Sequence, residues 1–81
     1  MMEIREIIRA KYIKPYIVEV IFDDYKKGRV DLRPYLNKGI LQELQDKKLF
    51  KRFTVDKELG TIVWGNGADI APETLYQEII K

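Results

Sequence analysis

Hydrophobic and polar residues alternate along two stretches near the start of the chain, over residues 7–13 and again over residues 16–22. Alternation with a period of two is typical of a β-strand, because successive side chains point to opposite faces of a sheet. Lys14 and Pro15 separate the two stretches, and proline interrupts a strand because it has no N–H to donate. The second stretch is largely apolar on both faces, so we expect two strands, the second of them central in its sheet.

A polar segment over residues 23–28 comes next, and it ends in Gly28. Glycine adopts positive φ at little cost, so we expect a hairpin loop that leads into a third strand over residues 29–32. A crossing from proline to glycine then occupies residues 33–39. After it, apolar residues return at helical spacing, which predicts a helix over residues 39–45.

The second half of the chain predicts a further helical segment, a second hairpin and a final helix. Asp46 stands where an N-cap is expected, because a carboxylate there accepts a backbone N–H from a helical segment over residues 47–52. Two β-prone runs, residues 54–56 and 61–64, flank a turn closed by glycine and predict the hairpin. Residues 72–81 open with proline and glutamate and carry an apolar stripe, which predicts an amphipathic helix.

The elements therefore follow the order β-β-β-α-α-β-β-α. They predict an α+β fold in which a mostly antiparallel, five-stranded open sheet packs against short helices. The chain has 81 residues and a mass of 9.6 kDa, which suits one domain over residues 1–81. A chain of this length buries roughly 60–65% of the surface that it exposes when unfolded, so we expect a thin core.

The amino-acid composition excludes several kinds of catalytic and metal-binding chemistry. The chain has no cysteine and no histidine, which excludes disulfides, thiolate nucleophiles, Cys/His zinc sites and imidazole catalysis. We therefore expect no cofactor, no metal site and no enzymatic activity. The 15 Lys and Arg residues exceed the 13 Asp and Glu residues by too few to indicate a partner. No apolar run approaches the ~18 residues of a membrane span, so we expect a cytoplasmic protein with no membrane association.

The loop over residues 65–69 is the most distinctive candidate site. Two glycines allow unusual backbone geometry, and Asn66 and Asp69 can present polar groups beside the flat face of Trp64. These three residues are therefore candidates for binding a ligand or a partner. The alternative is structural: the glycines make a turn, Asp69 accepts backbone N–H groups ahead of the last helix, and Trp64 fills the core.

Arg33 and Tyr35, on either side of Pro34, form a second candidate recognition surface. The alternative is that Tyr35 and Leu36 pack the crossing onto the core. The edges of an open sheet offer another route, because an edge strand can pair with a partner strand or with a second copy of the chain.

Two runs of basic residues raise the alternative of weak nucleic-acid binding. Interleaved carboxylates weaken both runs, and no aromatic-flanked basic groove or recognition motif accompanies them, so a solvated surface is the other interpretation. One run lies near the start of the chain: Arg5, Arg9, Lys11 and Lys14. The run that a nucleic-acid site would use lies on the second helical segment: Lys47, Lys48, Lys51 and Arg52.

Catalytic and metal-binding patterns are weak. The aspartates show no spacing that resembles an EF-hand loop, and Asp23 and Asp24 are ordinary turn residues. Nucleophilic catalysis could use Thr54, Thr61 or Thr74, but no histidine is available to activate a hydroxyl.

The stretch over residues 63–76 reads VWGNGADIAPETLY. It resembles the signature of the domain-of-unknown-function 2442 family of small prokaryotic proteins. The similarity extends to residues 22–24, 30–36 and 53–64, so it covers nearly the whole chain. Gly65 departs from the pattern, since many relatives carry a proline there, and this implies a more mobile loop.

The resemblance implies an α+β fold of the order given above and no established activity. Some relatives are fused to a helix-turn-helix DNA-binding domain, and others look like the neighbours of a second small protein, in an arrangement similar to a toxin–antitoxin pair. We therefore expect a non-enzymatic protein-interaction or regulatory module, such as the antitoxin-like half of a gene pair, that binds a protein partner or a second copy of itself. A weak nucleic-acid-binding domain is the alternative.

Overall fold

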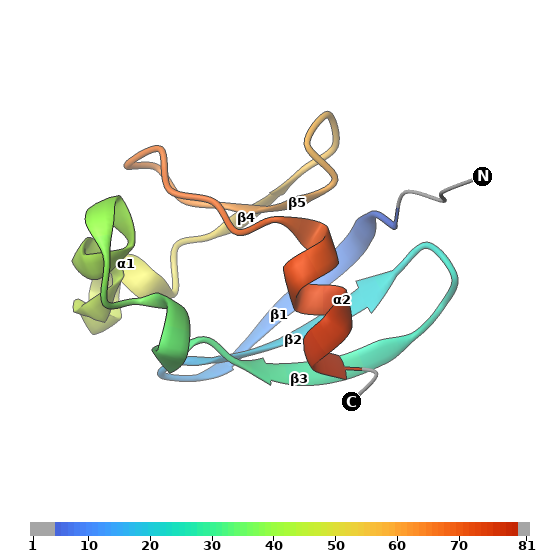
Figure 1. The fold of residues 1–81 in the computed structure, drawn as a ribbon, viewed down its shortest axis with the longest axis horizontal. Coiled ribbons are helices and arrows are strands. Elements are labelled where there is room, and N and C mark those ends of the chain that lie inside the picture. The colour runs from blue at the N-terminus through green and yellow to red at the C-terminus, as the bar shows by residue number, and fades with distance from the viewer. Residues whose placement is uncertain (1–4, 80–81) are drawn as a thin grey trace.

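The computed structural model describes residues 5–79 and contains two antiparallel sheets. The first sheet has three strands, β1 (Ile7–Lys14), β2 (Ile17–Phe22) and β3 (Lys27–Asp31), in the order β1-β2-β3. The predicted central position of the second strand is therefore confirmed. In Figure 1 the remaining elements all lie on one side of this sheet, which leaves its other face uncovered.

The covered face of the first sheet carries the core. Along β2 the side chains of Val18, Val20 and Phe22 are fully buried, whereas the residues between them are only half-buried. Val18 pairs with Val30 of β3, which is buried as well. Antiparallel partners share a face, so the register of one strand places the apolar residues of its neighbours in the same layer.

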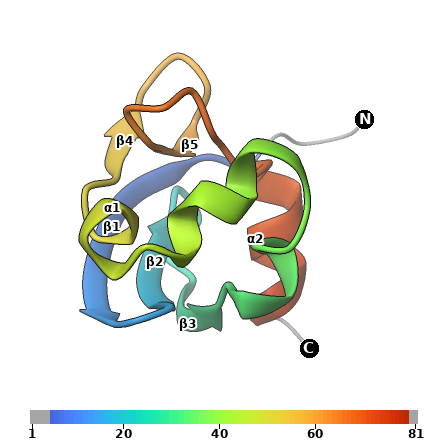
Figure 2. The same cartoon turned by 90° about the vertical axis from the view of Figure 1, so that its left-hand side faces the viewer.

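The second hairpin consists of β4 (Thr54–Asp56) and β5 (Thr61–Val63) and forms a sheet of its own. The prediction of one five-stranded sheet is therefore wrong. The register of β1 shifts between Ile7 and Arg9, and such an irregularity bends an edge strand. Within the described residues, one backbone hydrogen bond joins β1 to the turn of this hairpin: the N–H of Ile7 donates to the carbonyl of Gly60 over 2.8 Å. Figure 2 shows the hairpin above β1.

Three short helical segments connect the sheets: two 3-10 helices, η1 (Arg33–Tyr35) and η2 (Gly39–Gln45), and one α-helical turn, α1 (Lys47–Phe50). The predicted helix over residues 39–45 has the right bounds but the wrong type. In a 3-10 helix the side chains at i and i+3 lie above one another, so Leu41 and Leu44 face the core while Ile40 remains 45% exposed.

Asp46 caps α1 as predicted. Its Oδ1 accepts a hydrogen bond of 2.9 Å from the backbone N–H of Lys48. The helix ends at Phe50, two residues before the predicted end. Phe50 is fully buried, and its ring contacts the rings of Tyr16 and Trp64. One helical turn thus places an aromatic side chain between the turn that joins β1 to β2 and the residue that follows β5.

The final helix, α2 (Pro72–Ile79), crosses the covered face of the first sheet, as Figure 1 shows. The predicted apolar stripe faces the core, with Leu75 fully buried and Tyr76 and Ile79 half-buried; Ile80 and Lys81 lie outside the described residues.

Gly28 belongs to β3 rather than to the hairpin loop, so its predicted turn role is corrected. The positive φ of the loop, 68°, is at Tyr25. A Cβ atom on Gly28 would lie 2.7 Å from Cγ2 of Ile79, so this glycine is needed where α2 approaches the sheet.

Candidate functional site

Trp64 belongs to the core. Its side chain is 3% exposed, and its Nε1–H donates a hydrogen bond of 2.7 Å to the carbonyl of Phe50. The rings of Phe50 and Phe53 lie 6.1 and 6.2 Å from the indole, centroid to centroid. Of the two predicted roles of Trp64, the structure shows the core-filling one: the indole packs between aromatic rings and is not exposed beside the loop.

The loop that follows Trp64 is a hydrogen-bonded turn. The N–H of Trp64 donates to the carbonyl of Ala68 over 2.9 Å, and Gly67 has a φ of 92°, which favours glycine. Asn66 stabilises the turn from both ends of its amide: Oδ1 accepts from the N–H of Ala68, and Nδ2 donates to the carboxylate of Glu43, each over 3.0 Å. The side chain of Asn66 is thus already engaged within the protein.

Asp69 has a different environment. It is exposed, and no hydrogen bond or ion pair joins its carboxylate to another described residue. Its predicted structural role as an acceptor ahead of the last helix is therefore wrong. In the first turn of α2, the N–H groups of Thr74 and Leu75 donate to the carbonyl of Ala71. The carboxylate of Asp69 is available to a ligand or partner.

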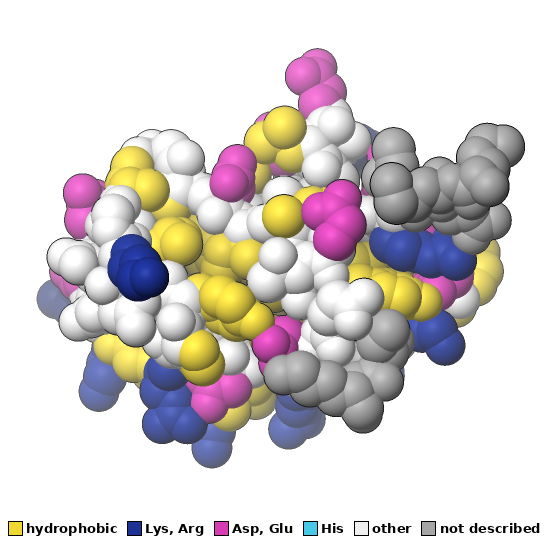
Figure 3. Space-filling model, in the orientation of Figure 1, with side chains coloured by type: hydrophobic (Ala, Val, Ile, Leu, Met, Phe, Trp, Pro, Cys, Tyr) yellow, Lys and Arg dark blue, Asp and Glu magenta, His cyan; other side chains and the backbone are white. Residues whose placement is uncertain are grey.

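Asp69 lies on the rim of an open groove with a volume of about 530 Å³. One wall comes from the crossing and η2, and the other comes from the segment that leads into α2. Apolar side chains make the floor, and polar groups surround it. The lining residues are Pro34, Tyr35, Asn37, Lys38, Leu41, Asp69, Ile70, Ala71 and Thr74. Figure 3 shows hydrophobic side chains gathered at the centre of this face, between the η1–η2 segment and α2.

Tyr35 is the second predicted site residue in this groove. Its hydroxyl donates a hydrogen bond to the carboxylate of Glu78 on α2. This bond, together with partial burial, raises the pKa of Tyr35 above its ordinary value. The bond also holds η1 against α2, so the Tyr35 ring is a fixed wall of the groove.

Arg33 does not join Tyr35 in the groove. Its guanidinium forms a two-armed pair with Asp31, in which Nε lies 3.0 Å from both carboxylate oxygens and Nη2 lies 2.5 Å from Oδ2. These hydrogen bonds hold the pKa of Asp31 below its usual range and raise that of Arg33. The Arg33 side chain is 71% exposed, so the pair lies at the surface.

The four cations of the second helical segment are all exposed. Lys47 and Lys48 lie on α1, and Lys51 and Arg52 follow it. Lys48 and Arg52 share a shallow depression with the carboxylate of Asp46, so a negative charge interrupts the basic surface there.

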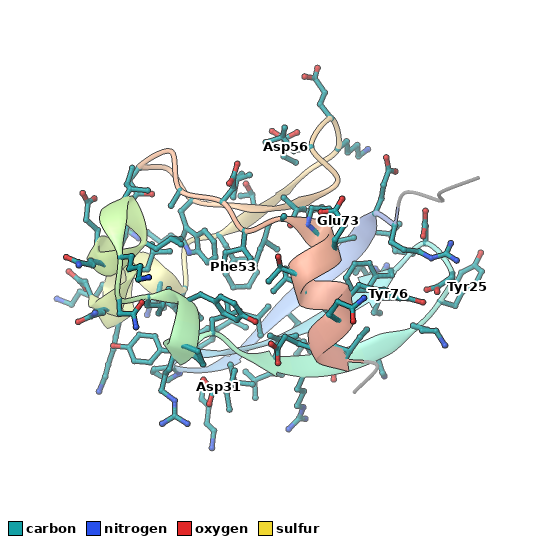
Figure 4. The ribbon with its side chains drawn as sticks, viewed as in Figure 1. Tyr25, Asp31, Phe53, Asp56, Glu73 and Tyr76 are labelled. Carbon is teal, nitrogen blue, oxygen red and sulfur yellow. The ribbon has the colours of Figure 1, made fainter. Side chains whose placement is uncertain are left out.

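A cluster that the sequence did not predict joins α2 to the β2–β3 loop. The hydroxyl of Tyr76 donates to Oδ2 of Asp24 over 2.6 Å, and Nε of Arg5 lies 3.6 Å from the same oxygen. The Tyr76 hydrogen bond is the main cause that lowers the pKa of Asp24, and it raises the pKa of Tyr76. Asp24 also accepts from the N–H of Lys26, which fits its predicted role in the turn. Figure 4 shows Tyr76 on α2 and Tyr25 at the tip of the hairpin.

No local sequence pattern predicts this cluster, because Asp24 and Tyr76 are 52 positions apart in the chain.

The catalytic and metal-binding candidates find other roles or no site. The hydroxyl of Thr61 is buried and donates a hydrogen bond of 2.6 Å to the carbonyl of Ile70, so it is used inside the fold. Over residues 5–79, no three His, Cys, Asp or Glu side chains are grouped so that they could hold a metal ion. The groove accordingly offers apolar surface, an available carboxylate and amide or hydroxyl groups, which suits binding.

Comparisons with known proteins give a family and no activity. No helix in the described part of the chain is long and apolar enough to cross a membrane. No curated protein and no solved structure matches the chain. A family model described as "Protein of unknown function (DUF2442)" matches residues 7–81, the range that contains both sheets, the groove and α2. The chain is therefore a member of the DUF2442 family, as the resemblance of residues 63–76 indicated.

Proposed function

We propose that this protein is a non-enzymatic interaction module that binds a partner protein through the groove between η2 and the start of α2. The observation that carries the proposal is the carboxylate of Asp69. It stands on the rim of an apolar groove and has no hydrogen bond or ion pair with any described residue. A polar group placed beside apolar surface in this way gives orientation and specificity to a bound segment.

The walls of the groove support binding without a large rearrangement. Tyr35 is held by Glu78, and the turn that leads to Asp69 is held by the two hydrogen bonds of Asn66. A site that is already ordered loses little conformational entropy when a partner binds. We expect the partner to place an apolar side chain against Leu41 and Ile70 and a lysine or arginine beside Asp69.

The proposed setting is regulatory. A short cytoplasmic chain that holds a second protein through one groove suits the antitoxin-like half of a gene pair, with the partner encoded beside it. The absence of histidine and cysteine from the chain favours binding over catalysis.

The test is recovery of the partner from the native host with tagged protein, followed by calorimetry of the purified pair. Asp69→Arg should weaken binding by at least about tenfold, because it replaces an attraction by a repulsion at the rim. Ala71→Arg, which fills the groove, should do the same.

Glu58→Arg is the matched control, since it makes the same change of charge at an exposed position outside the groove. A partner that binds all three variants with wild-type affinity would overturn the proposal. Loss of binding by Glu58→Arg alone would also overturn it.

A further inference from the structure

The uncovered face of the first sheet carries a registered array of cations. Strand pairing places the outward side chains in three rows that run across β1, β2 and β3. The rows are Arg9–Ile21–Lys27, Lys11–Glu19–Arg29 and Lys14–Ile17–Asp31. We call these nine residues the basic sheet face.

Five cations and two carboxylates make up the charge of this face, in a chain whose totals are 15 and 13. Successive rows lie about 7 Å apart along the strands, and β1 and β3 are about 10 Å apart across the sheet. Figure 3 shows Lys and Arg side chains along the underside of the three strands. Asp31, labelled in Figure 4, points from the sheet toward this side and away from α2.

Both carboxylates of the basic sheet face already have partners. Glu19 pairs with Arg29 across the strands at 3.7 Å, and Asp31 holds Arg33 at 2.5 Å. The other four cations, Arg9, Lys11, Lys14 and Lys27, form no ion pair with any described residue. Four positive charges on one face thus have no ion-pair partner among the described residues, although Lys14 lies near enough to Asp31 to act on it electrostatically.

We propose that the basic sheet face binds the phosphate backbone of double-stranded nucleic acid without reading its sequence. Lysine and arginine side chains that replace condensed counterions supply this type of binding, and they position a duplex without contacting its bases. The strands fix the spacing of the cations, which distinguishes this face from the four cations of α1 and its following turn, beside Asp46.

The three rows contain no aromatic ring and no large, exposed apolar side chain. This favours a duplex over a single strand or a membrane as the ligand. Single strands stack their bases on exposed aromatic rings, and no aromatic residue belongs to the three rows. Membrane association uses exposed apolar side chains. The large hydrophobic residues exposed in the described chain, Ile8, Tyr25, Ile40 and Leu59, all lie outside the rows. Ile17 and Ile21, which do belong to them, are half-buried between charged neighbours.

The test is fluorescence anisotropy with two labelled duplexes of unrelated sequence, measured between about 50 and 200 mM salt. The two duplexes should bind equally. Log affinity should fall against log salt with a slope of about −4, because each neutralised phosphate contributes about −0.9 and four cations lack a partner.

The triple variant Arg9→Gln, Lys11→Gln and Lys27→Gln should reduce the slope to about −1 and weaken binding by at least about tenfold at low salt. The matched control removes the same number of charges from the competing surface: Lys48→Gln, Lys51→Gln and Arg52→Gln. This control should bind duplex as the wild type does. Far-ultraviolet circular dichroism checks that each variant folds.

A gain of binding gives a second, independent readout. Glu19→Gln removes a carboxylate and releases Arg29, so the slope should become steeper by about one and the affinity should rise. The proposal is overturned if duplex binding is absent at low salt, if the α1 variant loses binding while the sheet variant keeps it, or if vesicles of anionic lipid or an acidic peptide bind in place of the duplex.

Discussion

The groove and the basic sheet face lie on opposite sides of the first sheet, and the chain assembles them in different ways. The groove is built from two segments about 30 positions apart, one around Tyr35 and Leu41 and one around Asp69 and Ile70. The basic sheet face is built from strands that follow one another. Its rows come from alternation along β2 and β3, and from β1, whose register shifts between Tyr12 and Lys14.

The comparison shows two ways in which a thin domain can present a binding surface. On the sheet face, the same period of two that buries Val18 and Val20 turns the intervening charged residues outward. In the groove, no local period places Asp69 near Leu41, and the position of Asp69 depends on the packing of the turn anchored by Trp64. A groove of this kind should therefore be sensitive to core substitutions, and the sheet face should not.

The largest expected effect comes from Trp64, which is buried and anchors the turn that precedes Asp69. Trp64→Ala should lower the free energy of unfolding by roughly 3–5 kcal/mol, because it removes a large buried side chain and leaves the carbonyl of Phe50 without its donor. Urea denaturation followed by circular dichroism measures this loss. Trp64→Phe, which keeps most of the packing, should lose less. A Trp64→Ala protein as stable as the wild type would show that the indole is not part of the core.

The next effect concerns the approach of α2 to the sheet. Gly28→Ala should destabilise the fold by roughly 1–3 kcal/mol, since the new Cβ meets Ile79 at 2.7 Å and α2 must move. Gly65→Ala is the matched control, because nothing lies within 4 Å of a Cβ at that position. The two melting temperatures make the comparison. Equal values for both variants would mean that α2 does not depend on Gly28.

A smaller effect, with a defined pH dependence, is expected at the Asp24–Tyr76 pair. The folded protein holds the pKa of Asp24 below its unfolded value, so the pair contributes stability above the unfolded pKa and loses it as the pH falls through the folded pKa. Tyr76→Phe removes the largest cause of this shift. It should be less stable than the wild type near neutral pH, and the difference should vanish in acid. Thermal melts at several pH values measure it, and a difference that grows in acid would contradict the assignment.

The smallest effect on stability is expected at Asp69. Asp69→Ala should change the free energy of unfolding by less than about 0.5 kcal/mol, because its carboxylate bonds to no side chain or backbone group within residues 5–79. Asp46→Ala, by contrast, removes a cap and should cost about 1 kcal/mol. Denaturation curves of the two variants make the comparison. A loss at Asp69 as large as that at Asp46 would indicate a structural role and would remove the main support for the groove proposal.

Much of the fold follows from local patterns that the sequence displays. The two alternating stretches predict β1 and β2 and make β2 central, and Asp46 marks the start of α1. These predictions succeed because strand faces and helix caps depend on neighbours within a few positions.

The failures share a different cause. The period of the apolar residues does not distinguish a 3-10 helix from an α-helix over seven residues, so η2 was predicted with the wrong type. Local patterns also do not show which strands pair with one another, so the sequence predicts one sheet where the structure has two. The sequence also predicts that Asp69 accepts backbone N–H groups ahead of α2. In the structure, the carbonyl of Ala71 accepts N–H groups from the first turn of α2, and the carboxylate of Asp69 does not.

The sequence by itself determined the central position of β2, the cap of α1, the absence of histidine and cysteine, and the family to which the chain belongs. Only the tertiary structure decided that Trp64 is enclosed and that Tyr35 is bonded to Glu78, 43 positions away. It also decided that the carboxylate of Asp69 has no hydrogen bond or ion pair with any described residue. The reason is physical. Alternation is a property of the extended backbone, whereas the partner of a side chain depends on which distant segments pack together to bury the core.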